Sequence, residues 1–197
     1  MSPKVDAHDE RAIVDAARAG DEAALAELYS LYFPRVYRYI LARMGNPYDA
    51  EDLTEEVFLR VLDAIERFEW RAAPFSAWLF RIAHNAVISH RRKLGARGRS
   101  SPLSDALPMD SQGPEEMVAN RLALNEIMKA AETLPDAQRR VISLRFAAGL
   151  TVAETARAMD KGEGNVKVIQ HKAIAKLREM LGQKPRGKSK VHEKGRV

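Results

Sequence analysis

The chain has 197 residues, of which 46% are hydrophobic and 30% are charged, and it contains no cysteine. These values allow one or two small packed domains, whereas the lack of cysteine excludes a disulfide framework, thiolate catalysis and cysteine-based zinc sites. No apolar run approaches the roughly 18–20 residues that a membrane helix needs, and the polar N-terminus lacks the apolar segment of a signal peptide. We therefore expect a cytoplasmic protein without membrane insertion.

Charge is distributed unevenly along the chain. The formal net charge is +5, and residues 182–197 account for all of it, with six bases and one acid. In the neutral remainder, residues 49–66 hold seven acids and one base, whereas residues 70–104 hold seven bases and no acid. An acidic segment followed by a basic one indicates two different partners, although two solvated helix faces would give the same pattern.

The first half of the chain shows helical periodicity and no convincing alternating strand. We expect a short helix at residues 9–19 and a longer one that is capped by Asp21. Gly45-Asn46-Pro47 should end that helix, Asp49 should cap the next one, and a turn should lead into a third long helix at Phe75. The apolar positions expected to face a common core are Leu25, Leu28, Tyr32, Val36, Tyr39, Ile40, Leu53, Val57, Val61, Ile65, Phe75, Trp78 or Leu79, Ile82 and Ala86. These elements predict an all-α bundle of about 90 residues.

A stretch rich in Gly, Ser and Pro, residues 96–118, separates this bundle from a second helical unit. Such a composition is typical of a flexible linker. Fully extended, the stretch would reach roughly 75 Å at about 3.3 Å per residue, so the two units could engage separate sites. The sequence thus predicts two small helical domains, at 1–95 and 119–181, and a disordered basic tail at 182–197.

The second unit has the pattern of a helix-turn-helix. Two helices are expected over about 121–134 and 135–149, with Pro in the first turn of the second. Residues 151–154 (TVAE) match a capping box, residues 160–164 form a glycine turn, and a last helix runs over about 165–181. The side chains expected to face inward in the last two helices are Ala153, Ala156, Met159, Val166, Ile169, Ile174, Leu177 and Leu181. A short capped helix, a tight turn and a longer basic helix favour DNA binding.

Two groups of side chains suit nucleic acid. On the last helix, Lys167 can bond guanine and Gln170 can bond adenine, with His171 and Lys172 beside them. The alternative is a solvated face of a structural helix. Near the basic third helix, aromatic residues could stack on unpaired bases, although they could equally fill the core. These aromatic residues are Phe68, Trp70, Phe75, Trp78 and Phe80.

Catalytic motifs are lacking. The five histidines form no paired ligand spacing, and HExxH, GxSxG and phosphate-binding glycine loops are absent from the sequence. The acids of residues 49–56 fit stabilisation of a helix N-terminus better than a metal cluster. We therefore expect no enzyme activity and no metal or cofactor.

Three ordered blocks resemble the bacterial sigma-70 family of RNA polymerase sigma factors, in its compact extracytoplasmic-function (ECF) group. The blocks are 49–58 (DAEDLTEEVF), similar to region 2.2, 75–85 (FSAWLFRIAHN), similar to regions 2.3 and 2.4, and 134–141 (LPDAQRRV) with 166–173 (VKVIQHKA), similar to region 4. The resemblance covers about residues 20–95 and 120–181. It implies a factor that directs polymerase to promoters and itself catalyses no reaction.

The resemblance implies several partners. The acidic helix would dock on the β′ clamp helices of core RNA polymerase, and polymerase would also be contacted at the β flap. The side chains implied in polymerase binding are Asp49, Glu51, Asp52, Leu53, Glu56 and Val57. Many relatives are held inactive by an anti-sigma factor, and the resemblance leaves such a partner open.

Promoter DNA is the other implied partner, at two elements. Opening of the −10 element and capture of an unstacked base would use Phe68, Arg71, Arg81, His84, Asn85, His90, Arg91 and Arg92. Reading of the −35 element would use Asn165, Lys167, Val168, Gln170, His171 and Lys172. Two other functions fit parts of the pattern: a stand-alone helix-turn-helix regulator, which would bind duplex DNA tightly without polymerase, and a helical adaptor without a nucleic-acid role.

Overall fold

The computed structural model describes residues 7–70, 73–96, 126–127 and 129–182. Within these ranges the chain forms helices and turns and no strand, as the sequence predicts. Most of the expected linker and tail, together with Arg71, lies outside the described residues. Among the described helices, none is long and apolar enough to cross a membrane.

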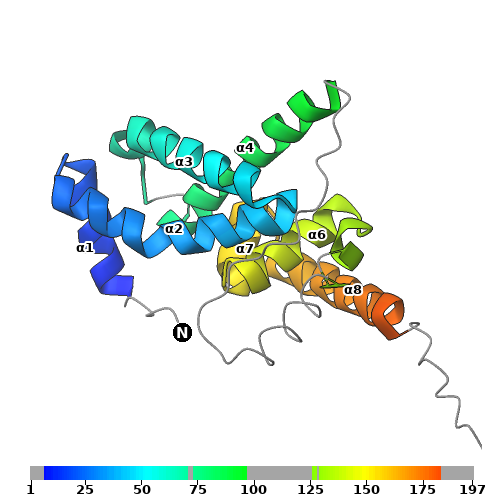
Figure 1. Cartoon of the computed structure of the whole chain (residues 1–197). Coiled ribbons are helices and arrows are strands. Elements are labelled where there is room, and N and C mark those ends of the chain that lie inside the picture. The colour runs from blue at the N-terminus through cyan, green and yellow to red at the C-terminus, as the bar shows by residue number, and fades with distance from the viewer. Residues whose placement is uncertain (1–6, 71–72, 97–125, 128, 183–197) are drawn as a thin grey trace, which may run out of the picture.

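The N-terminal unit is a bundle built around one long helix (Figure 1). Its elements are α1 (Ala7–Arg18), α2 (Glu22–Met44), α3 (Pro47–Ala64), the short 3-10 helix η1 (Ile65–Arg67) and α4 (Phe75–Ala96). Helices α1 and α3 pack against α2, and α4 packs against both α2 and α3. Most of the predicted stripe positions are buried, whereas Leu25, Trp78 and Ile82 are only partly covered.

Helix boundaries in this unit follow local capping, with one correction. The Asp21 carboxylate caps α2 by accepting two backbone N–H bonds of 2.8 and 3.1 Å, as expected. Gly45 ends α2 in the left-handed conformation, with φ of 76°. The prediction that Asp49 caps α3 is wrong. The Asn46 side chain accepts the cap bonds at 2.9 and 3.3 Å, and Pro47 occupies the first turn, where its missing N–H costs nothing.

The C-terminal unit is a helix-turn-helix, and helical residues at 126–127 and 129–132 precede it. Its further elements are α6 (Asp136–Ile142), the π-helix η2 (Ser143–Ala147), α7 (Val152–Met159) and α8 (Glu163–Gly182). The predicted capping box is confirmed, because the Thr151 hydroxyl and the Glu154 carboxylate satisfy each other's backbone N–H groups.

Three details of this unit differ from the sequence prediction. The helix expected to continue to Gly149 widens into η2, which brings Leu144, Ala148 and Leu150 all into the core. Helix α8 begins two residues before Asn165, because Asp160 takes the left-handed turn, with φ of 53°, that a glycine was expected to supply. Ala153 is exposed rather than inward-facing.

The two units pack against each other into one body. Helices α2 and α4 of the first unit contact η2 and α7 of the second. One hydrophobic cluster runs through both, joining residues such as Val36, Leu79 and Ala83 to Leu144 and Met159. A smaller cluster joins the helical residues at 129–132 to α8. Side chains on the faces that meet are therefore covered in this structure, which affects how available the predicted interface residues are.

Candidate protein and nucleic-acid interfaces

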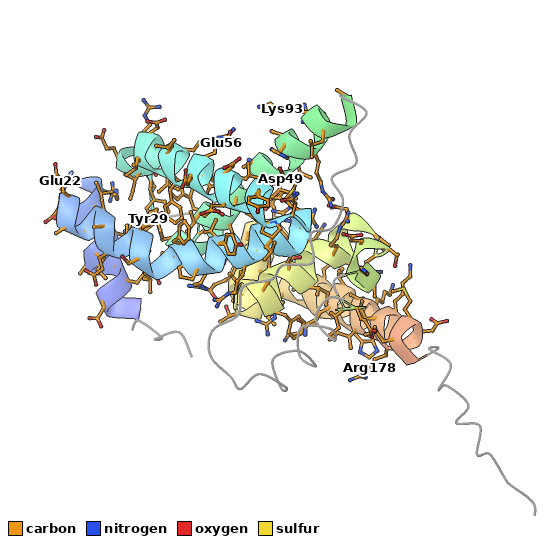
Figure 2. The ribbon with its side chains drawn as sticks, in the orientation of Figure 1. Glu22, Tyr29, Asp49, Glu56, Lys93 and Arg178 are labelled. Atoms are coloured by element: carbon orange, nitrogen blue, oxygen red, sulfur yellow. The ribbon has the colours of Figure 1, made fainter. Side chains whose placement is uncertain are left out.

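Helix α3 presents an exposed acidic face. Glu51, Asp52 and Glu55 are exposed, and Glu56, which is 43% exposed, pairs with Arg60 one turn later. Figure 2 shows Asp49 and Glu56 along α3, far from the C-terminal end of α8. Among the described residues, no three His, Asp or Glu side chains gather in a way that could hold a metal ion. The face therefore suits a basic protein surface.

Two residues predicted for this interface lie beneath it. Leu53 is 1% exposed and Val57 is 0% exposed, because both pack into the core of the bundle. In this structure they support the acidic face from within and do not reach a partner.

An apolar cavity of about 210 Å³ adjoins the acidic face, between α2 and α3. Tyr29 and Phe58 meet in its lining, with ring centres 4.8 Å apart, and Leu62 borders it with 49% of its surface exposed. Leu59, which is 63% exposed, extends the apolar surface along α3. Exposed apolar area of this kind marks a partner site. The sequence reasoning missed it, although Leu59 and Leu62 lie visibly off the buried stripe of α3.

The turn before α4 holds its aromatic side chains in a cluster. Phe68 is only 3% exposed, and its ring centre lies 5.0 to 5.4 Å from those of Trp70, Phe75 and Trp78. Phe68 was predicted to line a base pocket, but here it forms the floor beneath Trp70 rather than a free stacking surface. Arg71, predicted beside it, lies outside the described residues.

The basic side chains of α4 are only partly available. Arg81, Asn85 and Arg92 are exposed, whereas His84, His90 and Arg91 are half-buried. Arg81 donates a long bond of 3.4 Å to the Arg157 carbonyl in α7. Arg91 donates to the Arg43 carbonyl at 2.7 Å, and His90 Nε2 lies 4.0 Å from an Asp49 carboxylate oxygen.

His84 is the predicted DNA-binding residue most affected by the packing. Its Nδ1 lies 3.3 Å from the Tyr39 hydroxyl oxygen. Burial, together with the positive charges of Arg140 and Arg43, lowers the pKa of His84 to about 4. The imidazole is therefore neutral near pH 7 and offers no positive charge to a phosphate in this state.

Polar contacts fasten α2 and α4 to the second unit. The Arg43 side chain is fully buried and donates to an Asp136 carboxylate oxygen at 2.5 Å. Partial burial would raise the pKa of Asp136, but the hydrogen bond from Arg43 and the positive charges of Arg43 and Arg139 together lower it. Arg35 and Arg38 donate to the Ala148 and Ala147 carbonyls at 2.9 and 3.1 Å.

A further bond joins the start of α4 to the capping box of α7. The Ser76 hydroxyl donates to a Glu154 carboxylate oxygen at 2.6 Å. Burial would raise the pKa of Glu154, but the hydrogen bonds from Ser76 and Thr151 lower it overall. Sequence reasoning missed these contacts. A signal existed only for Arg43, which continues the apolar stripe of Val36 and Ile40.

The predicted −35 residues form an exposed face on α8. Asn165, Lys167, His171 and Lys172 are exposed, and Val168 is 53% exposed among them. Gln170 is different, because its side-chain oxygen accepts a 3.1 Å bond from Arg145 Nε. The face can thus present cationic and polar donors to a major groove, with Gln170 held by the preceding η2.

Family models match both units of this chain. The Sigma-70 region 2 model matches residues 28–97, and the Sigma-70, region 4 model matches residues 130–179. The chain belongs to the sigma-70 family.

Similar curated proteins narrow this to the ECF group. The chain is 39% identical over 171 residues to the ECF RNA polymerase sigma factor BldN of Streptomyces coelicolor, a match that covers 86% of this chain and 64% of BldN. It is 35% identical over 190 residues to the ECF RNA polymerase sigma factor SigD of Mycobacterium tuberculosis, which covers 92% of this chain and 89% of SigD. The chain is therefore an ECF member of the sigma-70 family.

Solved structures share the fold. CnrH in complex with the cytosolic domain of CnrY matches with a TM-score of 0.68 at 24% identity, covering 90% of this chain and 98% of CnrH. The sigma factor RpoE of Bartonella quintana, solved with the anti-sigma factor NepR, matches with a TM-score of 0.65 at 23% identity, covering 80% and 96%.

Proposed function

We propose that this chain binds core RNA polymerase, recognises the −35 and −10 promoter elements and promotes the strand opening that begins transcription. One observation carries the proposal: an exposed acidic helix, α3, and a helix with an exposed cationic face, α8, lie on opposite sides of α2 in one small body (Figure 2). A protein that joins a basic protein surface to promoter DNA needs both. The polymerase supplies the chemistry, and this chain acts on it in the cytoplasm without catalysing a reaction.

The proposed polymerase contact uses the acidic face of α3. Asp52 and Glu51 would meet basic groups of the β′ clamp helices, and Glu56 would exchange Arg60 for a base of the partner. Support comes from the exposure of these acids and from the adjoining apolar cavity, which together offer the apolar centre and charged rim of a protein interface.

The proposed −10 contact uses α4 and the turn before it, within a domain that spans residues 1–95. Extracting a base from the duplex costs a few kcal/mol. Stacking on an aromatic surface, at about 1–3 kcal/mol per base, and phosphate contacts from Arg81 and Arg92 can offset that cost. Trp70 and Trp78, which are partly exposed above Phe68, are the available rings.

The proposal includes a separation of the two units when DNA binds. Helix α7 and η2 cover part of α4 and α2, and charged groups of α6 act on His84 and Arg91, which are both half-buried. Parting the units, joined through the linker at 96–118, would expose both side chains and let His84 regain its ordinary pKa. Binding to polymerase and promoter would supply the free energy for this change, because both favour the open form.

The proposed −35 contact uses the exposed face of α8, within a domain that spans residues 119–181. Lys167, His171 and Lys172 would reach bases or phosphates, and the second unit would also contact the β flap. We extend the proposal to an anti-sigma partner, because the sigma factor RpoE of Bartonella quintana, which shares this fold, was solved with the anti-sigma factor NepR. Co-purification of the chain from its host would reveal polymerase and any inhibitor together.

Run-off transcription tests the proposed function. Core polymerase with this chain should transcribe from promoters selected out of a library of duplexes with randomised −35 and −10 segments, whereas either component alone should not. Failure of the chain to bind core polymerase would remove the proposal. Tight duplex binding without polymerase would instead favour a stand-alone regulator, and DNA affinity that does not depend on salt would favour a helical adaptor.

A further inference from the structure

Helix α1 lies outside both family matches, yet it is firmly attached to the first unit. It packs against α2 and η1 (Figure 1). Val14 and Ala17 are 0% and 1% exposed in the core, and a Glu10 carboxylate oxygen accepts a 2.6 Å bond from the Tyr32 hydroxyl. The helix is therefore placed well enough to hold something else in position.

Asp15 of α1 reaches across to the turn that precedes α4. Its Oδ1 accepts a 2.8 Å bond from the indole Nε1 of Trp70, 55 residues further along the chain. The same oxygen accepts a 3.2 Å bond from Arg18, and its Oδ2 lies 3.8 Å from Arg11 Nε. Two cations of the same helix thus hold the carboxylate ionised and oriented. The bond from Trp70 is also the main reason that the pKa of Asp15 is lowered.

Trp70 is thereby held from two sides. On its outer side, the Arg11 guanidinium lies 5.4 Å from the centre of its ring. On its inner side, its ring centre lies 5.0 Å from that of Phe68 at an interplanar angle of 75°. Phe68 in turn packs against Phe75, at the start of α4. The indole is the outer member of an aromatic stack whose inner member is fixed by the core.

We propose that α1 is a positioning element of the −10 site, in which Asp15 fixes the Trp70 indole on which an unstacked promoter base stacks. This rests on the proposed function. Asp15 touches no DNA, and its effect passes through Trp70. An indole that is held in position in advance loses less conformational freedom when the base binds, so base capture is tighter and more selective.

A purely structural role for α1 makes a different prediction. If α1 only stabilised the bundle, loss of the Asp15–Trp70 bond would lower transcription from every template by the same factor. If α1 positions Trp70, removal of the Asp15–Trp70 bond should reduce the preference for the selected −10 sequence over its single-base variants. The preference at the −35 element, which is read by α8, serves as the internal standard.

The test uses the full chain with core polymerase and a promoter that the wild-type chain selects from the randomised duplex library. Asp15→Leu removes the acceptor, Trp70→Phe removes the donor and keeps an aromatic ring, and Asp15→Asn keeps an acceptor. Asp9→Leu, at an exposed acid of the same helix, is the matched control. Run-off yields are compared between the selected promoter and its single-base variants at each element.

Asp15→Leu and Trp70→Phe should each reduce −10 discrimination about fivefold, as expected for one hydrogen bond to a charged group at a solvent-exposed site, while −35 discrimination stays unchanged. Asp15→Asn should restore most of the discrimination, and Asp9→Leu should match the wild type. Faster amide exchange at residues 65–70 in the two disruptive variants would support the same role.

Two results would overturn the inference. The first is −10 discrimination equal to wild type in both Asp15→Leu and Trp70→Phe. The second is a loss of discrimination that is equal at both elements or that Asp15→Asn does not restore, which would mean that the Asp15–Trp70 bond has no specific effect at the −10 site. A wild-type chain that selects no promoter would remove the proposed function itself, an outcome distinct from either.

Discussion

Helices α3 and α4 are neighbours in sequence and in space, but their charged side chains differ in solvent exposure. The acids of α3 face solvent beside an open apolar cavity. On α4, Ser76 contacts Glu154 of α7, and Arg91 contacts the Arg43 carbonyl of α2. His84 is partly buried and lies near Arg140 of the second unit. The side proposed to face polymerase is thus exposed in the packed state, whereas the side proposed to bind the −10 element is partly covered.

This difference suggests an order of events. A partner can reach α3 without any change in the fold, but promoter DNA can reach all of α4 only after α7 and η2 move away. The units are held by the shared hydrophobic cluster and by a few hydrogen bonds, which contribute about 0.5–1.5 kcal/mol each. Such an interface can be stable in the free chain and still open when two large partners bind.

The largest expected effect comes from reversing charge on the exposed acidic face of α3. Asp52→Lys with Glu56→Lys should weaken core polymerase binding about hundredfold, near 3 kcal/mol, because two attractive contacts become repulsive. Fluorescence anisotropy of the labelled chain measures this. The control Asp9→Lys with Glu22→Lys changes the same net charge on α1 and α2 and should bind as wild type. Equal weakening in both variants would mean that α3 has no special part.

A smaller effect is expected at the exposed end of the second unit. Lys167→Ala with Lys172→Ala should weaken binding of the polymerase complex to promoter DNA about thirtyfold, near 2 kcal/mol, and lower the salt slope by about two. Filter binding over a range of salt concentrations gives both values. Lys129→Ala, a base outside α8, is the control. An unchanged salt slope would exclude contact between these lysines and phosphates.

The packing between the two units can be weakened directly by removing one of the contacts that join them. Asp136→Ala leaves the buried Arg43 guanidinium without its carboxylate, but the Asp136 side chain is 52% exposed, so the cost is reduced to about 1.5 kcal/mol. Urea unfolding measures the free energy, and small-angle scattering should detect a larger radius as the units part. Glu132→Ala is the matched control. A stable variant with an unchanged radius would show that this pair does not hold the units together.

The smallest effect concerns pH. The pKa of His84 is depressed to about 4 in the folded chain, whereas unfolded histidine titrates near 6.5. The unfolded state therefore binds more protons between these values, and stability should fall as pH drops from about 6.5 toward 4. Discounted for the exposure of His84, the loss is about 1 kcal/mol. His84→Gln should flatten this part of the urea-derived stability profile, and His171→Gln should not. Asp136 and Glu154, whose pKa values are also lowered, add to the loss only at still lower pH.

Local signals in the sequence predicted most of the fold. Asp21 and the Thr151–Glu154 pair were identified because a cap depends on residues two or three positions apart, and the apolar stripes because helical periodicity is local. Asn46 and Asp49 are both acceptable caps by residue type, and the prediction of Asp49 treats Pro47 as a helix breaker, whereas Pro47 is a first-turn residue after the Asn46 cap. The same periodicity predicts which residues lie on exposed helix faces, such as Asp52 and Lys172.

Contacts between distant segments could not be predicted in this way. Arg43 meets Asp136 across 93 residues and Ser76 meets Glu154 across 78, and no spacing rule relates such positions. Whether Phe68, His84 and Gln170 are available to nucleic acid depends on such tertiary contacts. The sequence could mark them as suited to nucleic acid, but only the packed structure places Phe68 under Trp70, His84 beside Arg140, and Gln170 against Arg145.

The central claim is that polymerase binds the available side while promoter DNA requires the covered side to open. Because the chain lacks cysteine, Glu22→Cys and Arg178→Cys can carry a fluorescent donor and acceptor, one on each unit (Figure 2). Energy transfer measured in the free chain should fall when core polymerase and a selected promoter are added together. Transfer that does not change in a complex active in run-off transcription would contradict this order of events.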